Sequence, residues 1–445
     1  RVVDLIVSAS WVVPVQPAGV LHNHAVAVNN SRIVDLLPIQ ECSEKYEGKE
    51  SHHLEGHALI PGMINAHTHT GMNLLKGYAD DYPLMEWLQD HVWPAEGFWA
   101  SPEFCRFGGE LSIAEMIKGG TTTANDMYWF VESLVPAVKN AHFRMMVSAA
   151  VIAFPFSTYG KCADDYIKIG CDFFEKYAND PNVIPAWGPH AVYTVPDDSM
   201  AEIGRLSVKY DSKVHIHLHE SASEMEMSHD QSGKRPMTRL ADANMINERL
   251  IAVHMTQLTD EEIQLLAEKK VSVVTCPASN MKLASGLCPV DKLMAAGVNV
   301  AIGTDSSTSN NDLDMLQEMR LTALLSKVTT MNAASIPAAQ ALQMATLNGA
   351  KALGLEKDLG SIEVGKLADL VGISLLGGVE TVPMYDPIAH IVYTSNRAEV
   401  QHVWIAGTKV LSNGKLVHID EPKLVKEAVA WGAKIKEWKE GQNIA

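Results

Sequence analysis

The stretch SKVHIHLHE, from Ser212 to Glu220, decides the fold class. Its histidines at positions 215, 217 and 219 alternate with apolar residues, a period of two that is typical of a strand carrying three imidazoles on one face. Glu220 follows just past the expected strand end. Branched apolar side chains normally fill the interior of a parallel barrel, so inward histidines there indicate a functional role. The spacing alone does not choose which of the three histidines would bind an ion.

Seven further strand-like apolar runs are spaced along the same part of the chain. Amphipathic stretches of helical period separate them, for example at 102–119 and 259–269. This repetition predicts an α/β fold, a (β/α)8 TIM barrel over residues 58–360. The eight predicted strands are ALIPGMINAH (58–67), GTTTANDM (120–127), FRMMVSAAVI (143–152), NVIPAWGPH (182–190), SKVHIHLHE (212–220), RLIAVHMTQL (249–258), KVSVVTCPAS (270–279) and GVNVAIGTDS (297–306).

Both ends of the chain are rich in short strand-like runs. Asn413-Gly414 is a strong hairpin turn between two of them. We therefore expect a small β-sandwich domain built from residues 1–57 plus 361–420, followed by a C-terminal helix over 421–445. The runs are DLIVSASWVV (4–13), HAVAVNNSRIVDLLP (24–38), SHHLEGHALI (51–60), ADLVGIS (368–374), HIVYTS (390–395), VQHVWIAGTKVL (400–411) and KLVHI (415–419).

Composition narrows the class of partner. The net charge of −17 repels phosphate backbones and anionic lipids, so we expect neither nucleic acid nor a membrane as partner. The zinc signature of nucleic-acid deaminases also needs a C-x-x-C pair, and the six cysteines contain none. No run approaches the roughly 20 apolar residues of a membrane span. With no secretory leader recognised at the start, the expected location is the cytoplasm.

Polar residues gather at the same end of successive predicted strands. The carboxyl ends of barrel strands share one face, and that face carries the chemistry of such barrels. Stability alone does not explain this clustering. The residues concerned are His67, His69, Asp126, His190, His217, Glu220, His254, Asn280 and Asp305.

Several of these side chains fit a metal centre. His67 and His69 lie two apart on a strand, so both imidazoles can reach one ion. The motif H-x-H is weak evidence by itself, since His22-Asn23-His24 also matches in a polar turn. Asp305 ends a strongly apolar strand, with a helix N-cap as the alternative role. Three histidines and a carboxylate on separate strands are the pattern of a catalytic zinc.

Two further residues suit proton transfer beside such an ion. Glu220, just past its strand end, has a carboxyl group free to act as a proton shuttle near an activated water. Its alternative is an exposed loop glutamate. His254 is a single histidine in the apolar strand IAVH, where a hydrogen-bonded core residue is the alternative.

The motifs PGMINAHTH, HIHLHE and GTDS, with His254 between the last two, resemble the amidohydrolase superfamily of distorted TIM barrels. The tail GSIEVGKLADLV (360–371) is similar to that superfamily's return into its β-sandwich. The resemblance implies His67, His69, His217 and Asp305 as metal ligands. Two-metal members carry a strand 4 lysine, which NVIPAWGPHA lacks. One divalent ion is therefore implied, with Zn²⁺ expected and iron, manganese or cobalt as alternatives.

Three segments narrow the resemblance to 5'-methylthioadenosine/S-adenosylhomocysteine deaminases. They are KGYADDYPLMEWLQDHVWPAE (76–96), GPHAVYTV (188–195) and CPASNMKLASG (276–286). The resemblance implies that Glu86 accepts hydrogen bonds from the ribose hydroxyls and that His190 contacts the nucleoside. A solvated helix residue and a structural barrel residue are the respective alternatives. Trp87 and Trp93 are interpreted as packing residues of the capping loop.

This family implies hydrolytic deamination of an adenine nucleoside thioether. Asp305 would take the proton of the attacking water, His254 would orient that water, and Glu220 would protonate the ring nitrogen and, with the metal site, bind the substrate. The alternatives are a deaminase of another heterocycle such as guanine or cytosine, a triazine chlorohydrolase, or a non-catalytic binding barrel. The expected partner is a small-molecule nucleoside, and the chain is expected to form a homo-oligomer.

Overall fold

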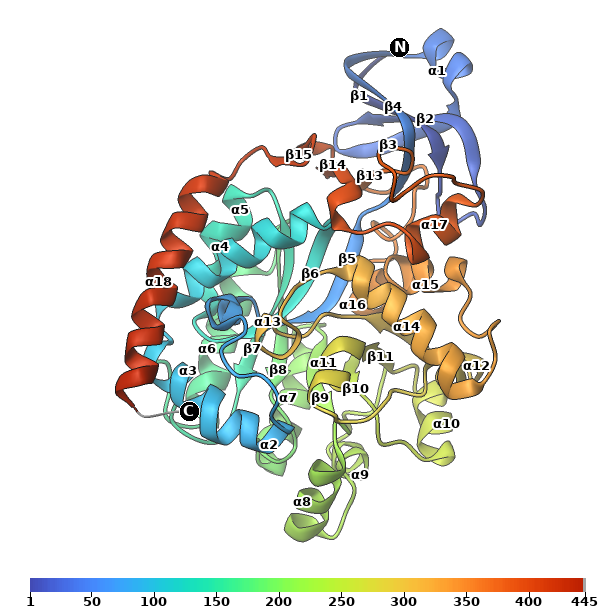
Figure 1. Ribbon diagram of the computed structural model, residues 1–445. Coiled ribbons are helices and arrows are strands. Elements are labelled where there is room, and N and C mark those ends of the chain that lie inside the picture. Colours follow the sequence, from blue (N-terminus) through green and yellow to red (C-terminus); the bar gives the residue numbers. More distant parts are fainter. Residues whose placement is uncertain (443–445) are drawn as a thin grey trace. The chain divides into compact units, whose positions relative to one another are not determined.

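The computed structural model describes residues 1–442 (Figure 1). Two eight-stranded sheets and two compact units organise these residues. One unit, made of Arg1–Asn65, Glu115–Thr123 and Asp314–His418, contains the sheet built from both ends of the chain. The other contains Ala66–Ala114 and Ala124–Leu313, and the C-terminal helix belongs to it.

The second sheet is parallel and follows the chain in strict order. All eight predicted barrel strands are present, and most are completely buried, as strands enclosed on both sides must be. The first begins later than predicted, because ALIP belongs to a strand of the other sheet that ends at Pro61. The barrel strands are β5 (Met63–Thr68), β6 (Thr121–Tyr128), β7 (Arg144–Val151), β8 (Val183–Pro189), β9 (Val214–Leu218), β10 (Leu250–His254), β11 (Ser272–Thr275) and β12 (Asn299–Ile302).

The ends of the last and first strands are joined by a backbone hydrogen bond. Asp305 N, three residues after β12, donates to His67 O of β5 at 3.0 Å. The strands can approach because Gly303 has no side chain: a Cβ there would lie 2.7 Å from His67 N. We call this contact between the end of β12 and the end of β5 the barrel seam. It brings residues that are distant in the sequence into one site.

Helices alternate with the barrel strands, as the amphipathic pattern predicts. The predicted helices at 102–119 and 259–269 are α4 and α10, and Thr259 begins α10 with a capping box. The helices of the barrel region are α4 (Pro102–Lys118), α5 (Val131–Asn140), α6 (Ala163–Tyr177), α7 (Asp197–Lys209), α8 (Ala222–Ser232), α9 (Pro236–Asp242), α10 (Asp260–Glu268), α11 (Pro277–Lys282), α12 (Val290–Ala295) and α13 (Ser307–Asn310). Next along the chain come α14 (Met315–Thr330), α15 (Ala338–Met344) and α16 (Leu347–Leu353).

A helical segment after β5 supplies part of the site wall. It comprises the 3-10 helix η1 (Thr70–Leu75), α2 (Leu84–Glu86), the π-helix η2 (Trp87–Val92) and α3 (Trp93–Trp99). The C-terminal helix α18 (Glu421–Gly441) lies beside α3 and α4 in Figure 1, where Trp431 contacts the rings of Trp99 and Phe104. The predicted helix range reached 445, and residues 443–445 lie outside the described part of the chain.

The first sheet combines strands from both ends. Its order is β16-β15-β14-β13-β4-β1-β2-β3, with β1 and β4 parallel and the other pairs antiparallel. One apolar cluster unites Val7, Ile33, Leu370 and Trp404, so the two ends share a core. The strands are β1 (Val2–Val12), β2 (Leu21–Asn29), β3 (Arg32–Pro38), β4 (Glu47–Pro61), β13 (Leu370–Ser374), β14 (Val400–Ile405), β15 (Thr408–Ser412) and β16 (Lys415–Leu416). The short helices are α1 (Ile39–Lys45), α17 (Pro387–Tyr393) and the 3-10 helix η3 (Arg397–Glu399).

The predicted fold class, a (β/α)8 barrel with a small β domain from both ends, is confirmed. One strand prediction in the small domain is wrong, because HIVYTS lies mainly in helix α17. Asp386 caps that helix by accepting from the N–H groups of Ile388 and Ala389, and Pro387 occupies its first turn. The domain bounds at 57/58 and 360/361 stay a prediction. No helix within residues 1–442 is long and apolar enough to cross a membrane.

Candidate active site

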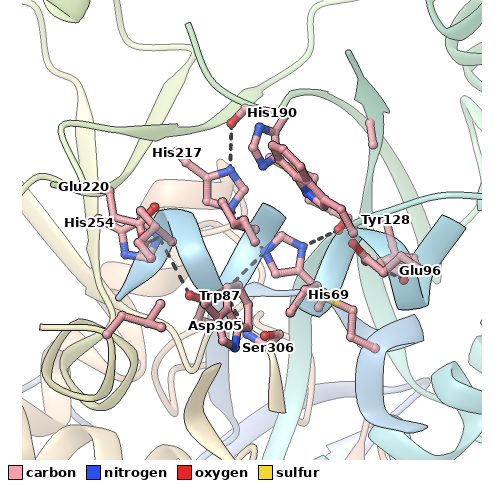
Figure 2. Close-up of a pocket in the computed structure, with 18 of the residues that line it drawn as sticks. His69, Trp87, Glu96, Tyr128, His190, His217, Glu220, His254, Asp305 and Ser306 are labelled. Carbon is pink, nitrogen blue, oxygen red and sulfur yellow. Dashed lines mark hydrogen bonds and ion pairs between the residues drawn. The ribbon is translucent and has the colours of Figure 1, made fainter. Parts of the chain in front are cut away.

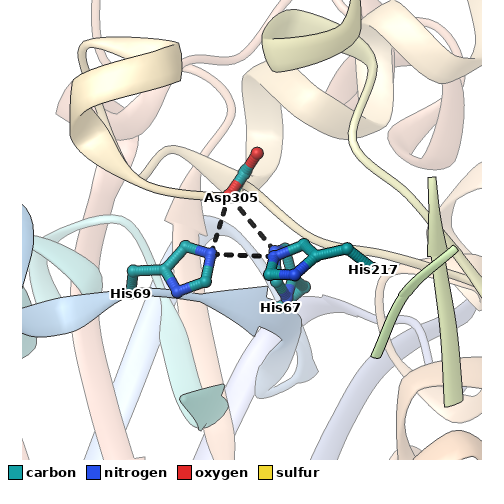
Figure 3. A group of neighbouring side chains, drawn as sticks. All are labelled: His67, His69, His217 and Asp305. Atoms are coloured by element: carbon teal, nitrogen blue, oxygen red, sulfur yellow. Dashed lines mark hydrogen bonds and ion pairs between the residues drawn. The ribbon is translucent and has the colours of Figure 1, made fainter. Parts of the chain in front are cut away.

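Four side chains meet at the carboxyl ends of three barrel strands (Figure 3). His67 is in β5 and His69 directly follows it, His217 is in β9, and Asp305 follows β12. One donor atom from each lies within 4.8 Å of all the others. Asp305 Oδ1 is 3.2 Å from Nε2 of both His67 and His69. Donors bound tetrahedrally at about 2.0–2.1 Å from a zinc ion would stand roughly 3.3 Å apart, so these distances fit one ion.

The hydrogen bonds of His69 and His217 show what the cluster requires. His69 Nδ1 donates to Met127 O at 2.6 Å, and His217 Nδ1 donates to His190 O at 2.7 Å. In the neutral form that binds a metal, each ring then presents a lone pair on Nε2, and these two nitrogens lie only 3.2 Å apart. Two lone pairs at that distance repel each other unless a cation lies between them. The donor set therefore fits a divalent metal ion.

The other two histidines of the motif serve different purposes. His215 Nε2 lies 2.7 Å from His67 Nδ1, so His215 fixes the ring of a ligand. His219 was expected on the same face, but β9 ends at Leu218 and His219 turns away with φ +52°. Its Nδ1 donates to Gln257 O at 2.8 Å, and its Nε2 accepts from Met237 N at 3.0 Å. His219 is thus a buried structural residue.

Asp305 is held as a carboxylate in a constrained backbone. Its φ is +59°, a left-handed conformation that is unusual outside glycine. Ser279 Oγ donates to its Oδ2 at 2.7 Å. Burial acts to raise the pKa of Asp305, but interactions with the rings of His67 and His69 outweigh it and hold the pKa well below its ordinary range. The alternative role of Asp305 as a helix cap falls to Ser306, which caps α13.

Glu220 and His254 face this cluster from one side. His254 Nε2 lies 3.6 Å from Glu220 Oε1 and 3.8 Å from Asp305 Oδ2. Asn280 Nδ2 donates to His254 Nδ1 at 3.0 Å, which leaves the imidazole proton on Nε2. That Nε2 is buried and has no hydrogen-bond partner in the described chain, so it is available to a water or substrate atom.

The surroundings of Glu220 favour a role as a proton donor. Burial, together with the nearby carboxylates of Asp305 and Glu224, raises its pKa well above the ordinary value. The raised pKa favours the protonated form, which can donate its proton. Asp126, another polar residue at a strand end, has a structural role instead. Its Oδ1 accepts a hydrogen bond from Thr70 N at 2.6 Å and so holds the backbone that follows β5.

The amidohydrolase family model matches residues 58–416. The chain belongs to the amidohydrolase family. It is 41% identical over 434 residues to a protein of Teredinibacter turnerae named 5-methylthioadenosine/S-adenosylhomocysteine deaminase, covering 97% of this chain and 98% of the relative. A protein of the same name from Thermodesulfovibrio yellowstonii is 39% identical over 420 residues, covering 94% and 95% of the two chains.

Two solved structures share the fold. An adenosine deaminase from Xanthomonas campestris with bound zinc is 44% identical, with a TM-score of 0.96 over 98% of this chain and 99% of that chain. An atrazine chlorohydrolase from Arthrobacter aurescens complexed with zinc has a TM-score of 0.90 over 96% and 100% of the chains, at 22% identity. The second likeness shows the fold alone.

The pocket of this amidohydrolase extends from the four-residue cluster to a wall on α3 (Figure 2). Glu96, on α3, lines it across from Glu220 and His254, and Tyr128 OH donates to Glu96 Oε1 at 2.8 Å. Burial raises the pKa of Glu96 to about 7. His190 also lines the pocket, and its Nδ1 is 2.9 Å from Thr194 Oγ1. Burial lowers the pKa of His190 to about 3, so its ring is neutral.

The structure places Glu96, and not Glu86, in the pocket wall. Glu86 is exposed on α2 and is absent from the pocket lining, whereas Glu96 is 6% exposed and lies inside it. Both belong to the segment that resembles the deaminases. About three helical turns separate the two glutamates, and no pattern in the segment predicts which of them faces the pocket. Trp87 and Trp93, interpreted as packing residues, both line the pocket.

Proposed function

We propose that this chain is a hydrolytic deaminase that releases ammonia from an adenine nucleoside thioether. The substrate class is 5'-methylthioadenosine, S-adenosylhomocysteine, or both, with adenosine as a further substrate. The observation that carries the proposal is the position of a buried glutamate with a raised pKa, Glu220, and of a buried imidazole nitrogen of His254, beside a cluster of three histidines and an aspartate in one pocket. Near full-length similarity to relatives of that name supports it.

The proposed cofactor is one zinc ion held by His67, His69, His217 and Asp305. Imidazole and carboxylate donors also accept iron, manganese or cobalt, so metal analysis is part of the test. Strand β8, with the sequence VIPAWGP, has no lysine to bridge a second ion. Bound there, the ion would act as a Lewis acid that lowers the pKa of the attacking water.

The remaining chemistry belongs to side chains of the chain. Protonated Glu220 gives its proton to adenine N1, which makes C6 electrophilic. Asp305 accepts the proton of the water that attacks C6, and the Nε2–H of His254 orients that water. The C6–N bond then breaks as the amino group takes the proton held by Asp305 and leaves as ammonia, while the C6 hydroxyl returns its proton to Glu220 and becomes the carbonyl. Water and the nucleoside thus yield ammonia and the inosine analogue, with no other reactant.

Glu96 takes the sugar-binding role that the sequence placed on Glu86. A buried carboxylate on the wall opposite Glu220 suits two hydroxyl donors on neighbouring carbons, because it has a free oxygen beyond the one bonded to Tyr128. His190 stays the proposed nucleoside contact beside it. A homo-oligomeric state and a cytoplasmic location stay predictions.

Ammonia release from a panel of substrates tests the proposal. Purified protein with its zinc content measured is assayed with methylthioadenosine, S-adenosylhomocysteine, adenosine, guanine, cytosine and a chlorotriazine. Ammonia from the adenine nucleosides is expected, with about one metal ion per chain. Activity restricted to guanine or cytosine, or chloride release from the triazine without ammonia from the nucleosides, would overturn the assignment. Glu220→Gln should abolish turnover and keep the metal, whereas loss of the metal would make Glu220 a ligand.

A further inference from the structure

A second chamber continues from the active-site pocket beyond Glu96. Its volume is about 180 Å³. Trp93, Glu96, Trp129 and His190 line both the pocket and the chamber, so the two cavities adjoin each other. Neither the proposed chemistry nor the metal cluster uses this space. What enters it must be a part of the substrate remote from the reacting carbon.

The chamber has aromatic walls that are fixed in place. The ring of Phe156 stacks on Trp129 with centroids 4.2 Å apart, and Phe154 lies at 6.0 Å from Trp93. The loop carrying both phenylalanines is tied down by Tyr166, whose hydroxyl donates to Phe154 O at 2.8 Å. Such a surface favours apolar and sulfur-containing groups, because sulfur makes favourable contacts with aromatic rings.

The order of the site residues fixes which part of a nucleoside reaches the chamber. The amino-bearing carbon must lie at the metal cluster, beside Glu220 and His254. The sugar hydroxyls face Glu96 on the opposite side, at the junction of pocket and chamber. With the base at the metal cluster and the 2' and 3' hydroxyls at Glu96, the 5' carbon is the remaining part of the ribose that can extend into the chamber. We propose that this aromatic chamber binds the 5' substituent and selects neutral 5'-alkylthio nucleosides over those with a charged amino-acid tail, an inference that rests on the proposed deaminase function.

Charge decides between the two kinds of thioether. The described residues that line the chamber include no lysine or arginine, and their acid is Glu96. Their imidazole, His190, has its Nδ1 beside Thr194 Oγ1 at 2.9 Å. The homocysteine tail carries a carboxylate and an ammonium group, and its carboxylate would find no cation here. Desolvating a charge without a partner is costly, whereas a methylthio group loses nothing in these surroundings.

The first test compares substrates on the wild-type metal-loaded enzyme. The panel is adenosine, 5'-methylthioadenosine, a neutral 5'-butylthio analogue and S-adenosylhomocysteine, with kcat/KM measured from ammonia release. We expect both neutral thioethers to exceed S-adenosylhomocysteine by about tenfold or more, and methylthioadenosine to exceed adenosine by a similar factor. The butylthio analogue separates charge from length. Should S-adenosylhomocysteine match or surpass that analogue, the chamber proposal is wrong while the deaminase function stands. No ammonia from any of the four overturns both.

The second test fills the chamber. Gly97 lines the chamber, and a Cβ built at this position meets no atom within 4 Å. The side chain of Gly97→Leu can therefore occupy part of the chamber without a backbone clash. We expect the ratio of kcat/KM for methylthioadenosine to that for adenosine to fall about tenfold. Gly432→Leu is the matched control, because Gly432 is also helical, exposed and open around its Cβ, but lies on α18. An unchanged ratio in Gly97→Leu, or an equal fall in Gly432→Leu, contradicts the proposal.

Discussion

Replacing His215 with leucine tests how the metal centre is held. His215 lies outside the four-residue cluster, but its Nε2 is 2.7 Å from His67 Nδ1 and its Nδ1 is 3.3 Å from Ser148 Oγ. Ser148 donates to Asn125 Oδ1 at 3.1 Å, and the amide group of Asn125 is oriented by its bond to Ala66 O. In this series of hydrogen bonds, each proton is donated in the direction away from the metal cluster. His67 Nδ1 is thereby kept as the donor, and Nε2, which faces Asp305, is the nitrogen that can bind the ion.

The expected size of the effect follows from the burial of this bond. His215 and His67 are both 0% exposed, so water cannot replace the lost partner. Losing an outer partner of a metal-binding histidine weakens metal affinity by about 10–100-fold. This equals about 1.4–2.7 kcal/mol, within the range for a broken buried hydrogen bond. We therefore expect the zinc Kd of His215→Leu to rise by about 10–100-fold.

Competition with a coloured zinc chelator measures that Kd, and thermal unfolding measures stability in the same samples. His219→Leu is the control: His219 is also 0% exposed, on the same segment, but its partners are Gln257 O and Met237 N. The control should lose stability and keep its zinc Kd within about threefold of wild type. A zinc Kd in His215→Leu within that margin, or equal losses in both variants, would refute the reasoning.

Three further outcomes are expected. The pKa of Glu96 is about 7 against its ordinary 4.5, so ionisation of Glu96 opposes folding. As pH rises from 4.5 to above 7, the free energy of unfolding of wild type should fall by about 2–3 kcal/mol relative to Glu96→Gln. Urea unfolding at several pH values measures this difference, and a difference that stays constant with pH would count against the prediction. Removing metal with a chelator should lower Tm, and zinc at about 1,000 times its Kd should restore about 4 kcal/mol, whereas an unchanged Tm would speak against the metal site. Gly303→Ala should destabilise the protein by about 1–3 kcal/mol and weaken zinc binding, because the new Cβ would lie 2.7 Å from His67 N. The control Gly432→Ala should leave stability unchanged or raise it. Similar results for both variants would disprove this explanation of the close approach between Gly303 and His67.

Much of the barrel could be predicted because its strands are buried on both faces. Continuous apolar runs ending in polar residues identify the strands and one functional face together, as at His67 and Asp305. Periodicity failed where a local effect was stronger. His219 continues the alternation of β9 in sequence, but its left-handed backbone takes it off the strand. HIVYTS contains β-branched residues, yet the Asp386-Pro387 cap begins a helix ahead of it.

The site wall could not be predicted from pattern in the same way. Glu86 and Glu96 lie in one helical segment that includes a π-helix, η2, between them. A π-helical turn shifts the faces of the helix that follows, so a period of 3.6 cannot carry orientation from one glutamate to the other. Tertiary packing decides that Glu96 faces the pocket, where it meets Tyr128.

The geometry of the site links its function to the stability of the fold. His254 and Asp305 adopt φ values of +82° and +59°, conformations that cost about 1–3 kcal/mol each outside glycine. The Nε2 atoms of His69 and His217 face each other at 3.2 Å, and the Glu220 carboxyl is buried with a raised pKa. None of these features favours the empty fold, and the glycine at position 303 lets Asp305 approach His67. A cation between the nitrogens removes the repulsion, and a substrate ring gives the Glu220 proton and the His254 N–H their partners. The strain of this site is therefore relieved by the ligands it is proposed to bind, which is why the metal-bound state should be the most stable one.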